Sequence, residues 1–318
     1  MKQALYTKYG PPDVLHVVEV PKPTIAPHEI LIKVHAAAAT SADARIRGAR
    51  FPRGFGFLAR IAFGITRPRN RVLGSTYSGV IAQVGDSVTQ HKVGDAVCGM
   101  TGVKMGTYSE YITVGSFKAL ATKPDSVSHE DAAGVLFGGT AALYFVRDIL
   151  NIGEGQTVLI NGASGAVGSN AVQLARHFGA TVTAVTSAKN AALVRKLGAS
   201  EVIDYTTQDI AGMNQTYDAV LDAVGTISPA LARTLIASGG RAGLMVAGLG
   251  ETLRAHGSIK TGTAPEKAED IAFLLDLVAN GTLKVVIDKV YAFEDIVAAH
   301  RHVDSGQKVG NVIIRVVK

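Results

Sequence analysis

The chain has 318 residues, 47% of them hydrophobic and 18% charged, with one cysteine and no tryptophan. At roughly 150 residues per domain this length predicts two domains, each able to bury enough surface to fold without disulfide or metal crosslinks. The single cysteine, Cys98, excludes an internal disulfide framework and Cys-rich zinc sites, and it fits a reducing compartment, so we expect a cytoplasmic protein.

Neither a membrane span nor a secretion signal is expected. The longest apolar stretch without a charge, residues 132–146, is too short to cross a bilayer. No apolar run follows the first lysine, as a signal peptide requires. We therefore expect no membrane partner. The formal charge of +6 fits nucleic acid, an acidic surface or a phosphorylated small molecule, and charge alone does not choose among them.

The first 120 residues are rich in β-strand patterns. Short β-branched runs alternate with turns that contain proline, glycine or aspartate. The runs are LHVVEV, EILIKVHAAA, SGVIAQVG, DAVCGM and YSEYITV, at residues 15–20, 29–38, 78–85, 95–100 and 108–114. We expect them to form a small, barrel-like β domain over residues 1–122.

A basic and apolar segment interrupts this domain at residues 53–71. Its arginines interleave with large hydrophobic residues, which predicts a short surface helix or lid with its apolar side facing the protein and its arginines in water. Nucleic-acid binding is the alternative that the charge leaves open. The residues concerned are Arg53, Phe55, Phe57, Leu58, Arg60, Ile61, Phe63, Arg67, Arg69 and Arg71.

From about residue 130 short apolar runs alternate with longer helical segments. This alternation predicts βαβ units on a doubly wound parallel sheet, so the fold class is α/β. We assign residues 123–258 to this domain. Strands are expected at 157–161, 181–186, 200–205, 217–224 and 241–247, with helices at 166–179 and 188–199.

Residues 259–318 are expected to return to the first domain. Proline suits the first turn of a helix and glycine its C-terminal end, so a helix is expected from Pro265 to Gly281. The two segments that follow, 287–306 and 311–317, predict a strand, a helix and a final strand.

The strand at 157–161 runs through the glycine-rich turn NGASGAVG directly into a helix. Ala163, Gly165 and Gly168 occupy the three small positions of a G-x-G-x-x-G-like turn, although alanine departs from the strict pattern. The helix N-terminus offers free N–H groups to an anion. We therefore expect a dinucleotide pyrophosphate to bind Gly162, Ala163, Ser164, Gly165, Ala166, Val167 and Gly168.

The end of the second strand indicates which coenzyme binds. A carboxylate usually stands there to bind the NAD ribose, yet no Asp or Glu occurs between Glu154 and Glu201. Hydroxyls, an amide and a cation suit a 2′-phosphate instead, so NADP(H) is favoured. The residues are Thr186, Ser187, Lys189 and Asn190, with Tyr205 after the third strand; alternatively Ser187 caps a helix and Lys189 and Tyr205 are simply exposed.

Several longer segments resemble one family. They are EILIKVHAAAATSADARIRG, LGSTYSGVIAQVGDSVTQHKVGDAVCGM, GTYSEYITV, AAGVLFGGTAALYFV, NGASGAVG and LGASEVIDYT. Together they are similar to the medium-chain dehydrogenase/reductase superfamily, in its zinc-independent quinone oxidoreductase branch with zeta-crystallin-like and alkenal or enoyl reductase members. The resemblance implies a Rossmann-type doubly wound parallel sheet, a GroES-like β-barrel catalytic domain and a homodimer.

We expect no catalytic metal. A catalytic zinc needs about three Cys, His or carboxylate ligands. The zinc-dependent relatives carry a cysteine in the stretch that matches ATSAD, and a Gly-His-Glu motif that matches Gly74, Ser75 and Thr76; this chain has neither. His300 and His302 are two residues apart on an expected helix and face opposite sides of it, so they do not share a metal.

The resemblance also implies where the acceptor binds, between the two domains. It places the nicotinamide near Thr140, Val224, Val246 and Ala247, although Thr140 could instead begin a helix. Candidate acceptor-side residues are Thr40, Asp43, Arg45, Tyr77 and Lys260, with Asp43 alternatively capping backbone N–H groups. The family often has Asn, Tyr and Asp where Thr40, Arg45 and Thr76 stand.

Three functions follow from these features. The first is an NADPH-dependent, zinc-independent reductase of quinones or α,β-unsaturated carbonyl compounds, because an electron-poor acceptor needs no Lewis acid. The second is an NADP-dependent alcohol or carbonyl dehydrogenase. The third, of another class, is a coenzyme-binding or RNA-binding protein with little turnover, for which the arginine segment is the only support.

Overall fold

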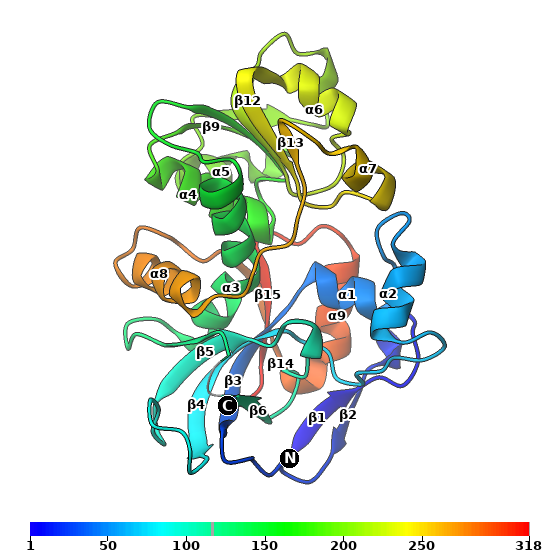
Figure 1. The fold of residues 1–318 in the computed structure, drawn as a ribbon, viewed down its shortest axis with the longest axis vertical. Coiled ribbons are helices and arrows are strands. Elements are labelled where there is room, and N and C mark those ends of the chain that lie inside the picture. The colour runs from blue at the N-terminus through cyan, green and yellow to red at the C-terminus, as the bar shows by residue number, and fades with distance from the viewer. Residues whose placement is uncertain (116–117, 318) are drawn as a thin grey trace.

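The computed structural model describes residues 1–115 and 118–317. Two sheets lie one above the other in Figure 1, with the N- and C-terminal parts of the chain in the lower one and the middle of the chain in the upper one. The mixed α/β class expected from the sequence is therefore confirmed.

The lower sheet has seven strands from both ends of the chain. β15 (Asn311–Arg315) pairs antiparallel with β3 (Glu29–Ala39), so the C-terminal segment does return to the first domain. The order is β14-β15-β3-β4-β5-β7, with β6 also on β3. The other strands are β4 (Thr76–Val84), β5 (Ala96–Met100), β6 (Tyr111–Gly115), β7 (Leu120–Thr122) and β14 (Ile287–Ala292); β1 (Lys2–Leu5) and β2 (His16–Glu19) pair separately.

Three helices border the lower sheet: α1 (Ser41–Arg47), α2 (Gly56–Phe63) and α9 (Ile296–Asp304). α2 confirms the surface helix expected within 53–71, but the expected orientation of its apolar side is wrong. Phe57, Leu58 and Ile61 are exposed, because the inward positions are already filled by Phe63, which stacks on Phe51. Arg53, Arg67, Arg69 and Arg71 are exposed as expected.

The upper sheet has six parallel strands in the order β10-β9-β8-β11-β12-β13, which is the doubly wound order of a dinucleotide-binding sheet. Ligands of such sheets bind at the carboxyl ends of the strands. The strands are β8 (Thr157–Asn161), β9 (Thr181–Thr186), β10 (Glu201–Asp204), β11 (Tyr217–Asp222), β12 (Ile236–Leu244) and β13 (Ile259–Lys260); the helices are α4 (Ala166–His177), α5 (Ala191–Leu197), α6 (Pro229–Leu235) and α7 (Leu249–Arg254).

Some expected boundaries differ for local reasons. β11 ends at Asp222 rather than at residue 224, because the Asp222 carboxylate accepts from the N–H groups of Val224, Gly225 and Ile227 and closes a turn. The segment 188–190 is a 3₁₀ turn that precedes α5. β13 pairs with β12, so the chain leaves the upper sheet after Lys260 and not at the expected boundary of 258/259.

α3 (His129–Leu143) and α8 (Ala268–Ala279) complete the core. Ser128 caps α3, which contacts β3 and β4 below and α4 above. With its π-helical continuation, α3 forms the helix His129–Ile149, which has the length and hydropathy of a membrane span. However, 67% of its most apolar 18-residue stretch is buried within the protein, as in a core helix. α8 starts at Ala268, because Lys267 is still extended.

Candidate functional site

The phosphate loop joins β8 to α4 and is held tightly by its own backbone. Gly162 has a φ of +79°, and its N–H and that of Ala163 both donate to the Val185 carbonyl at 3.1 Å. A Cβ on Gly168 would lie 2.1 Å from the Gly162 carbonyl oxygen, so only glycine lets α4 start this close to the strand. This is the close helix–strand packing that the third small position was expected to provide.

The start of α4 is open to an anion. Its N-cap residue is Gly165, and among the described residues no side chain caps this end. The first-turn N–H groups, from Ala166, Val167 and Gly168, therefore have no intrahelical partner and carry the positive end of the helix dipole. A pyrophosphate is the kind of group that such an N-terminus binds.

The end of β9 is tied to the phosphate loop by hydroxyl and amide groups. The Ser164 Oγ accepts from Thr186 Oγ1 at 2.9 Å and from Asn190 Nδ2 at 3.0 Å. Lys189 is exposed beside them, and Ser187 precedes the 3₁₀ turn without capping it through its side chain. The structure thus brings four of the residues expected to select the coenzyme to one place.

Asp204 is the carboxylate nearest to this group along the sheet. It ends β10, in register with Thr186 on β9. Its Oδ1 accepts from the N–H of Thr206 at 3.0 Å and from the Thr206 hydroxyl at 2.8 Å, and these bonds lower the pKa of Asp204. The ionised carboxylate is thus engaged by its own turn, and the backbone of Ala188, in the turn after β9, lowers its pKa further. Tyr205, which follows it, is 62% exposed.

The carboxyl ends of β11 and β12 close the same edge of the sheet. A Cβ on Gly162 would lie 2.4 Å from Val224 Cγ2, and one on Gly225 would lie 3.0 Å from the Val246 Cβ. The loops after β8, β11 and β12 therefore touch, and Ala247 follows directly. The residues expected to line the coenzyme lie together at the strand ends where the fold predicts a ligand.

On the lower sheet, the residues that follow β3 form a tight cap for α1. The Thr40 hydroxyl accepts from the Asp43 N–H at 3.2 Å and donates to Asp43 Oδ2 at 2.5 Å. Asp43 is fully buried, and its Oδ1 accepts from the Gly74 N–H at 3.0 Å. Burial raises the pKa of Asp43, while the bonds from Thr40 and Gly74 oppose the rise.

The expected alternative for Asp43, a backbone cap, is thus confirmed. The side chains of Thr40 and Asp43 hydrogen-bond to each other and to the backbone in a capping box, so they offer no free donor to a bound substrate. We describe both as positioning residues for α1.

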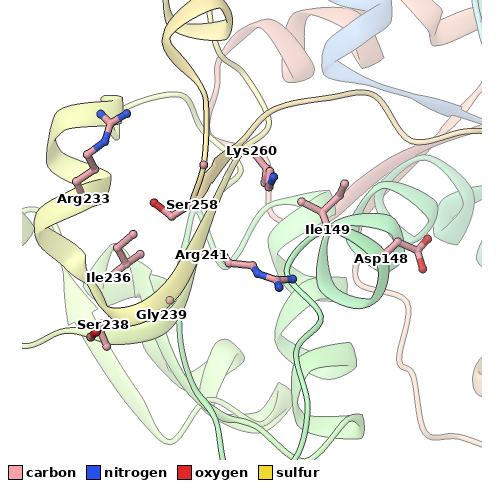
Figure 2. A pocket seen from close by; sticks show the side chains of 12 residues that line it. Asp148, Ile149, Arg233, Ile236, Ser238, Gly239, Arg241, Ser258 and Lys260 are labelled. Carbon is pink, nitrogen blue, oxygen red and sulfur yellow. The ribbon is translucent and has the colours of Figure 1, made fainter.

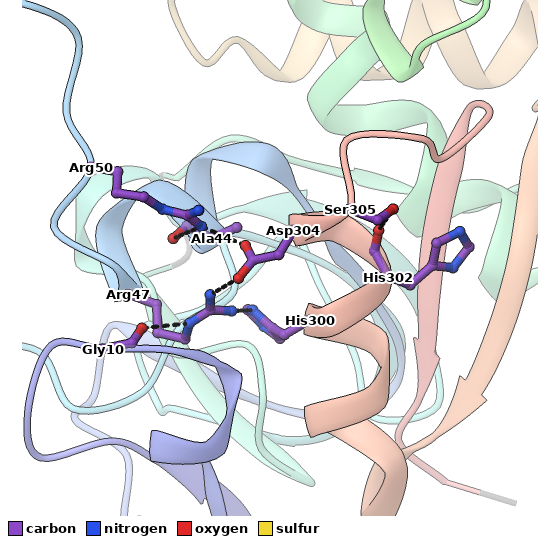
Figure 3. A network of polar contacts seen from close by, with 8 residues as sticks. All are labelled: Gly10, Ala44, Arg47, Arg50, His300, His302, Asp304 and Ser305. Carbon is purple, nitrogen blue, oxygen red and sulfur yellow. Dashed lines mark hydrogen bonds and ion pairs between the residues drawn. The ribbon is translucent and has the colours of Figure 1, made fainter.

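A buried ionic network fixes the other end of α1 (Figure 3). Arg47 is fully buried; its Nη2 donates to Asp304 Oδ2, its Nη1 lies 2.7 Å from His300 Nδ1, and its Nε donates to the Gly10 carbonyl at 3.2 Å. Arg50 reaches the other Asp304 oxygen at 2.5 Å. Burial, and then the charge of Arg47, lower the pKa of His300 to about 3, so this imidazole is neutral.

Arg45 differs from its neighbours on α1. It is half-buried, and no hydrogen bond or ion pair joins its guanidinium to any residue within 1–115 or 118–317; its backbone carbonyl accepts from the Arg50 N–H at 2.8 Å. Burial, and then the charge of Arg50, lower the pKa of its guanidinium. Among the expected acceptor-side residues that lie on α1, Arg45 is thus the one whose charge has no partner in the described part of the chain.

Thr140 lies in the last turn of α3, so it does not begin a helix. Its hydroxyl donates to the Leu136 carbonyl at 2.7 Å and lies 3.7 Å from the Met100 Sδ. Met100 is the register partner of Thr76, whose hydroxyl accepts from the Ala38 N–H at 3.3 Å. Thr140 is thereby linked, through Met100 and Thr76, to the end of β3 from which α1 starts.

Two expected acceptor-side residues lie elsewhere. Tyr77 is fully buried in the core of the lower sheet, against Gly99, and its hydroxyl has no hydrogen-bond partner in the described part of the chain. Every residue from Thr76 to Gly79 is buried, so no alternation in the strand marked Tyr77 as inward. It is not available to an acceptor.

Lys260 is exposed at the edge of the upper sheet. There it lines a groove of about 840 Å³ with Arg233, Arg241 and Asp148, and no other expected site residue is among the residues described for that groove. Figure 2 shows Arg241 and Lys260 along β12 and β13 and Arg233 on the neighbouring helix α6. The groove belongs to the sheet edge and not to the carboxyl ends of the strands.

No metal-ligand set appears in the part of the chain that the structure describes: no three His, Cys, Asp or Glu side chains come together. Cys98 is buried, which raises the pKa of its thiol to about 12. His300 lies beside Arg47, whereas His302 lies 3.0 Å from Asp288. The donor groups present do not fit a zinc ion.

Sequence reasoning missed two residues of this region. Asp222 is fully buried and organises the loop after β11; an acidic residue at the end of an apolar strand was the available signal. Lys308 donates to the Gly310 carbonyl, and the Gly310 N–H donates to the Ser164 carbonyl at 2.8 Å. Burial lowers the pKa of Lys308 to about 8, and nothing in its sequence context showed that it approaches the phosphate loop.

Comparisons with known proteins cover the whole chain. Residues 26–125 match the family described as alcohol dehydrogenase GroES-like domain, and residues 197–314 match the one described as zinc-binding dehydrogenase. The chain is 31% identical to the NADPH-dependent alkenal/one oxidoreductase of Arabidopsis thaliana chloroplasts, over 99% of this chain and 79% of that one.

Solved structures are similar over the same length. The quinone oxidoreductase of Coxiella burnetii superposes with a TM-score of 0.90 at 28% identity, over 100% of this chain and 99% of that one. An NAD-dependent alcohol dehydrogenase superposes with a TM-score of 0.86 at 26% identity, over 100% of both chains.

Proposed function

Because the chain belongs to the quinone oxidoreductase branch of the medium-chain dehydrogenase/reductase superfamily, we propose that it is an NADPH-dependent, zinc-independent reductase of quinones or α,β-unsaturated carbonyl compounds. The observation that carries the proposal is the end of β9, where Thr186 and Asn190 bind Ser164 of the phosphate loop and no carboxylate is available within the strand or the turn after it.

The residues present fit NADP(H). The uncapped start of α4 suits the pyrophosphate, and the hydroxyls of Thr186 and Ser187 with the Lys189 ammonium suit a 2′-phosphate. Lys308 adds a second cation, bound to the carbonyl of Gly310, whose N–H donates to Ser164 of the loop. When bound, the coenzyme supplies a hydride to the acceptor.

The protein's own contribution on the acceptor side is electrostatic. Reduction of a quinone or an enone makes negative charge grow on a conjugated oxygen, which a fixed positive charge stabilises. Arg45 is the group on α1 with no ion pair to any described residue, and the Thr40–Asp43 cap and the Arg47 network hold the helix that carries it. We therefore propose that Arg45 stabilises the negative charge on this oxygen, and that the reduced acceptor takes its proton from solvent.

Zinc is not part of this proposal. Where zinc-dependent relatives carry a cysteine and a Gly-His-Glu motif, this chain has the stretch ATSAD and the residues Gly74, Ser75 and Thr76. The fold already uses two of the hydroxyls there: that of Thr40 donates to Asp43, and that of Thr76 accepts from the Ala38 N–H. We expect full activity after extensive dialysis against a chelator, and no stimulation by added zinc.

The test is a screen of absorbance at 340 nm with NADPH and with NADH, against quinones, enals and enones, followed by mass analysis of the product. We expect NADPH oxidation with at least one acceptor class and a saturated carbonyl or a hydroquinone as product. Arg45→Gln should lower kcat at least about tenfold while leaving the Kd of NADPH unchanged. The proposal would be refuted if NADPH were not oxidised with any acceptor, or if the protein oxidised alcohols only in the presence of zinc.

A second candidate is an NADP-dependent alcohol or carbonyl dehydrogenase, which the similarity to a solved alcohol dehydrogenase favours. The same product analysis separates the two, because this enzyme would reduce the C=O of an enone and leave the C=C intact. Oxidation of simple alcohols by NADP⁺ would also identify it.

We also propose a homodimer and a cytoplasmic location. β13 is an edge strand of the upper sheet, so its outer side is free to pair with a second copy. A buried thiol of raised pKa suits a reducing compartment. Light scattering after gel filtration would measure the mass; a monomer at micromolar concentration would refute the dimer.

A further inference from the structure

The outward face of α2 is apolar. Phe57, Leu58 and Ile61 are 76%, 53% and 46% exposed, and Ile65 just beyond the helix is 65% exposed. Positions 57, 58 and 61 lie within about 100° of one another around a helix, so they form one stripe. We call these four residues the α2 stripe.

The stripe is a cluster and not a scatter. Nine large hydrophobic side chains are exposed among the described residues, and four of them fall within residues 57–65. The inward side of the same helix is apolar as well, since Phe63 stacks on Phe51 with 5.9 Å between ring centroids. A helix that is apolar on both sides is normally covered on both. The α2 stripe is therefore a candidate contact surface.

Arginines surround the stripe and lack acidic partners. Arg53, Arg67, Arg69 and Arg71 are exposed, and none of the four forms an ion pair with a residue in the described ranges. No Asp or Glu occurs between Asp43 and Asp86. The surface is thus positive as well as apolar.

The stripe stands where the two sheets' domains meet. The Leu249 N–H donates to the Arg53 carbonyl at 2.8 Å, which places the segment before α2 against the start of α7. Figure 1 shows α2 and α7 on the same side of the molecule. Leu253, one turn further along α7, is also exposed, at 77%.

We propose that the α2 stripe and its arginines dock the protein on an anionic lipid bilayer, with Phe57, Leu58 and Ile61 in the headgroup–acyl boundary and the arginines on the phosphates. A bilayer supplies both an apolar layer and negative charge, as interfacial helices of this composition require. This replaces the expectation of no membrane partner, which considered a membrane span and a secretion signal but not a helix lying on the bilayer surface. The docking does not depend on the proposed function.

Other occupants fit less well. Nucleic acid would pair with the arginines but leave the stripe exposed to water. A second copy related by a two-fold axis would set this arginine cluster against itself, with no carboxylate from residues 44–85 to offset the repulsion.

The experiment is co-sedimentation of the full chain with phosphatidylcholine vesicles, with and without 30% phosphatidylserine, and without coenzyme or acceptor. We expect binding to the anionic vesicles at least about tenfold tighter than to the neutral ones, with loss of binding in 1 M salt, where charges are screened within about 3 Å. Phe57→Asn combined with Ile61→Asn should weaken binding at least about tenfold. Arg67→Gln and Arg69→Gln should each weaken it about fivefold.

Matched controls are Val93→Asn, an equally exposed hydrophobic residue that is 60% exposed, and Arg195→Gln on α5. Both should bind as the native chain does, and circular dichroism should show all variants folded. The proposal is overturned if the two vesicle types bind alike or if the controls lose as much as the stripe variants. It is also overturned if the protein does not bind vesicles but binds single-stranded RNA. A third refuting result is that the protein does not bind vesicles and the stripe variants convert a dimer into monomers.

Discussion

The end of β9 allows a sharp test of coenzyme choice through Lys189. This lysine is exposed beside the Ser164–Thr186–Asn190 cluster, and Lys189→Glu replaces an attraction to the 2′-phosphate by a repulsion. Asp204 already lies on the neighbouring strand, in register with Thr186, and its carboxylate is bound by Thr206. The glutamate introduced at position 189 therefore adds a second carboxylate to this region.

The size of the effect follows from Coulomb's law. Two unit charges about 4 Å apart interact by about 1 kcal/mol in water, and screening at physiological salt reduces this to roughly 0.6 kcal/mol. A phosphate carries roughly −1.5 to −2 charges near pH 7, and the substitution changes the facing charge by two units. The binding free energy of NADPH should therefore weaken by about 2 kcal/mol. Because 1.4 kcal/mol corresponds to a tenfold change in Kd, the Kd of NADPH should rise about 30-fold.

Isothermal titration calorimetry with NADPH and NADH measures both affinities. We expect NADH, which lacks the phosphate, to change less than about threefold, so that the preference for NADPH falls by most of the 30-fold. The matched control is Lys196→Glu, an exposed lysine at the other end of α5, about 10 Å along the helix. It should leave both affinities unchanged at physiological salt.

Two results would refute this reasoning. One is an equal loss of NADPH and NADH binding, which would mean that Lys189 supports the loop and not a phosphate. The other is that the native protein binds NADH more tightly than NADPH, which would indicate that Asp204 binds the ribose hydroxyls of NADH. In that case Asp204→Asn should weaken NADH binding and leave NADPH unaffected.

Three further variants test the supporting structure. Asp43→Asn cannot accept from all the donors that face this buried carboxylate, so urea unfolding should show a loss of about 2–4 kcal/mol; a change below 0.5 kcal/mol would show that the cap is dispensable. Gly168→Ala puts a Cβ 2.1 Å from the Gly162 oxygen and should weaken coenzyme binding at least about tenfold, whereas Gly153→Ala, with open space around it, should not; equal behaviour would contradict the packing argument. His300 is neutral when folded, with its pKa at about 3, so the unfolded chain binds the extra proton below about pH 6.5 and stability falls as the pH drops. Between pH 7 and pH 5 this amounts to about 2 kcal/mol, and His300→Gln should remove that part of the pH dependence measured by urea unfolding; an unchanged slope would show that other groups cause it.

The sequence predicted which residues of the expected coenzyme site lie together, because this part of the chain is local. A strand, a small-residue turn and a helix follow one another within residues 157–177, and their backbone geometry alone makes the anion site. The link from Asn190 to Ser164 spans 26 residues but joins the ends of neighbouring parallel strands, which the βαβ pattern already places together.

The acceptor half could not be predicted in the same way, because it depends on contacts between distant segments. Nothing near Tyr77 shows that its ring lies in the core against Gly99, and nothing near Lys260 shows that it sits at a sheet edge. The α2 stripe reversed the expected orientation because Phe51, outside the helix, helps to fill the inward side that the pattern assigned to Phe57 and Leu58.

The return of the chain to the lower sheet also connects the two halves. Asp304, at the end of α9, holds Arg47 and Arg50 on and beside α1, which carries Arg45. A few residues later, the Gly310 N–H donates to the Ser164 carbonyl in the phosphate loop. One short segment, 304–310, therefore fixes the acceptor-side charge relative to the coenzyme loop. If Arg45 is the catalytic charge, as the proposed function has it, it must keep its position relative to the reacting atoms to within about 1 Å. Under that proposal, residues 304–310 position Arg45 as well as completing a sheet.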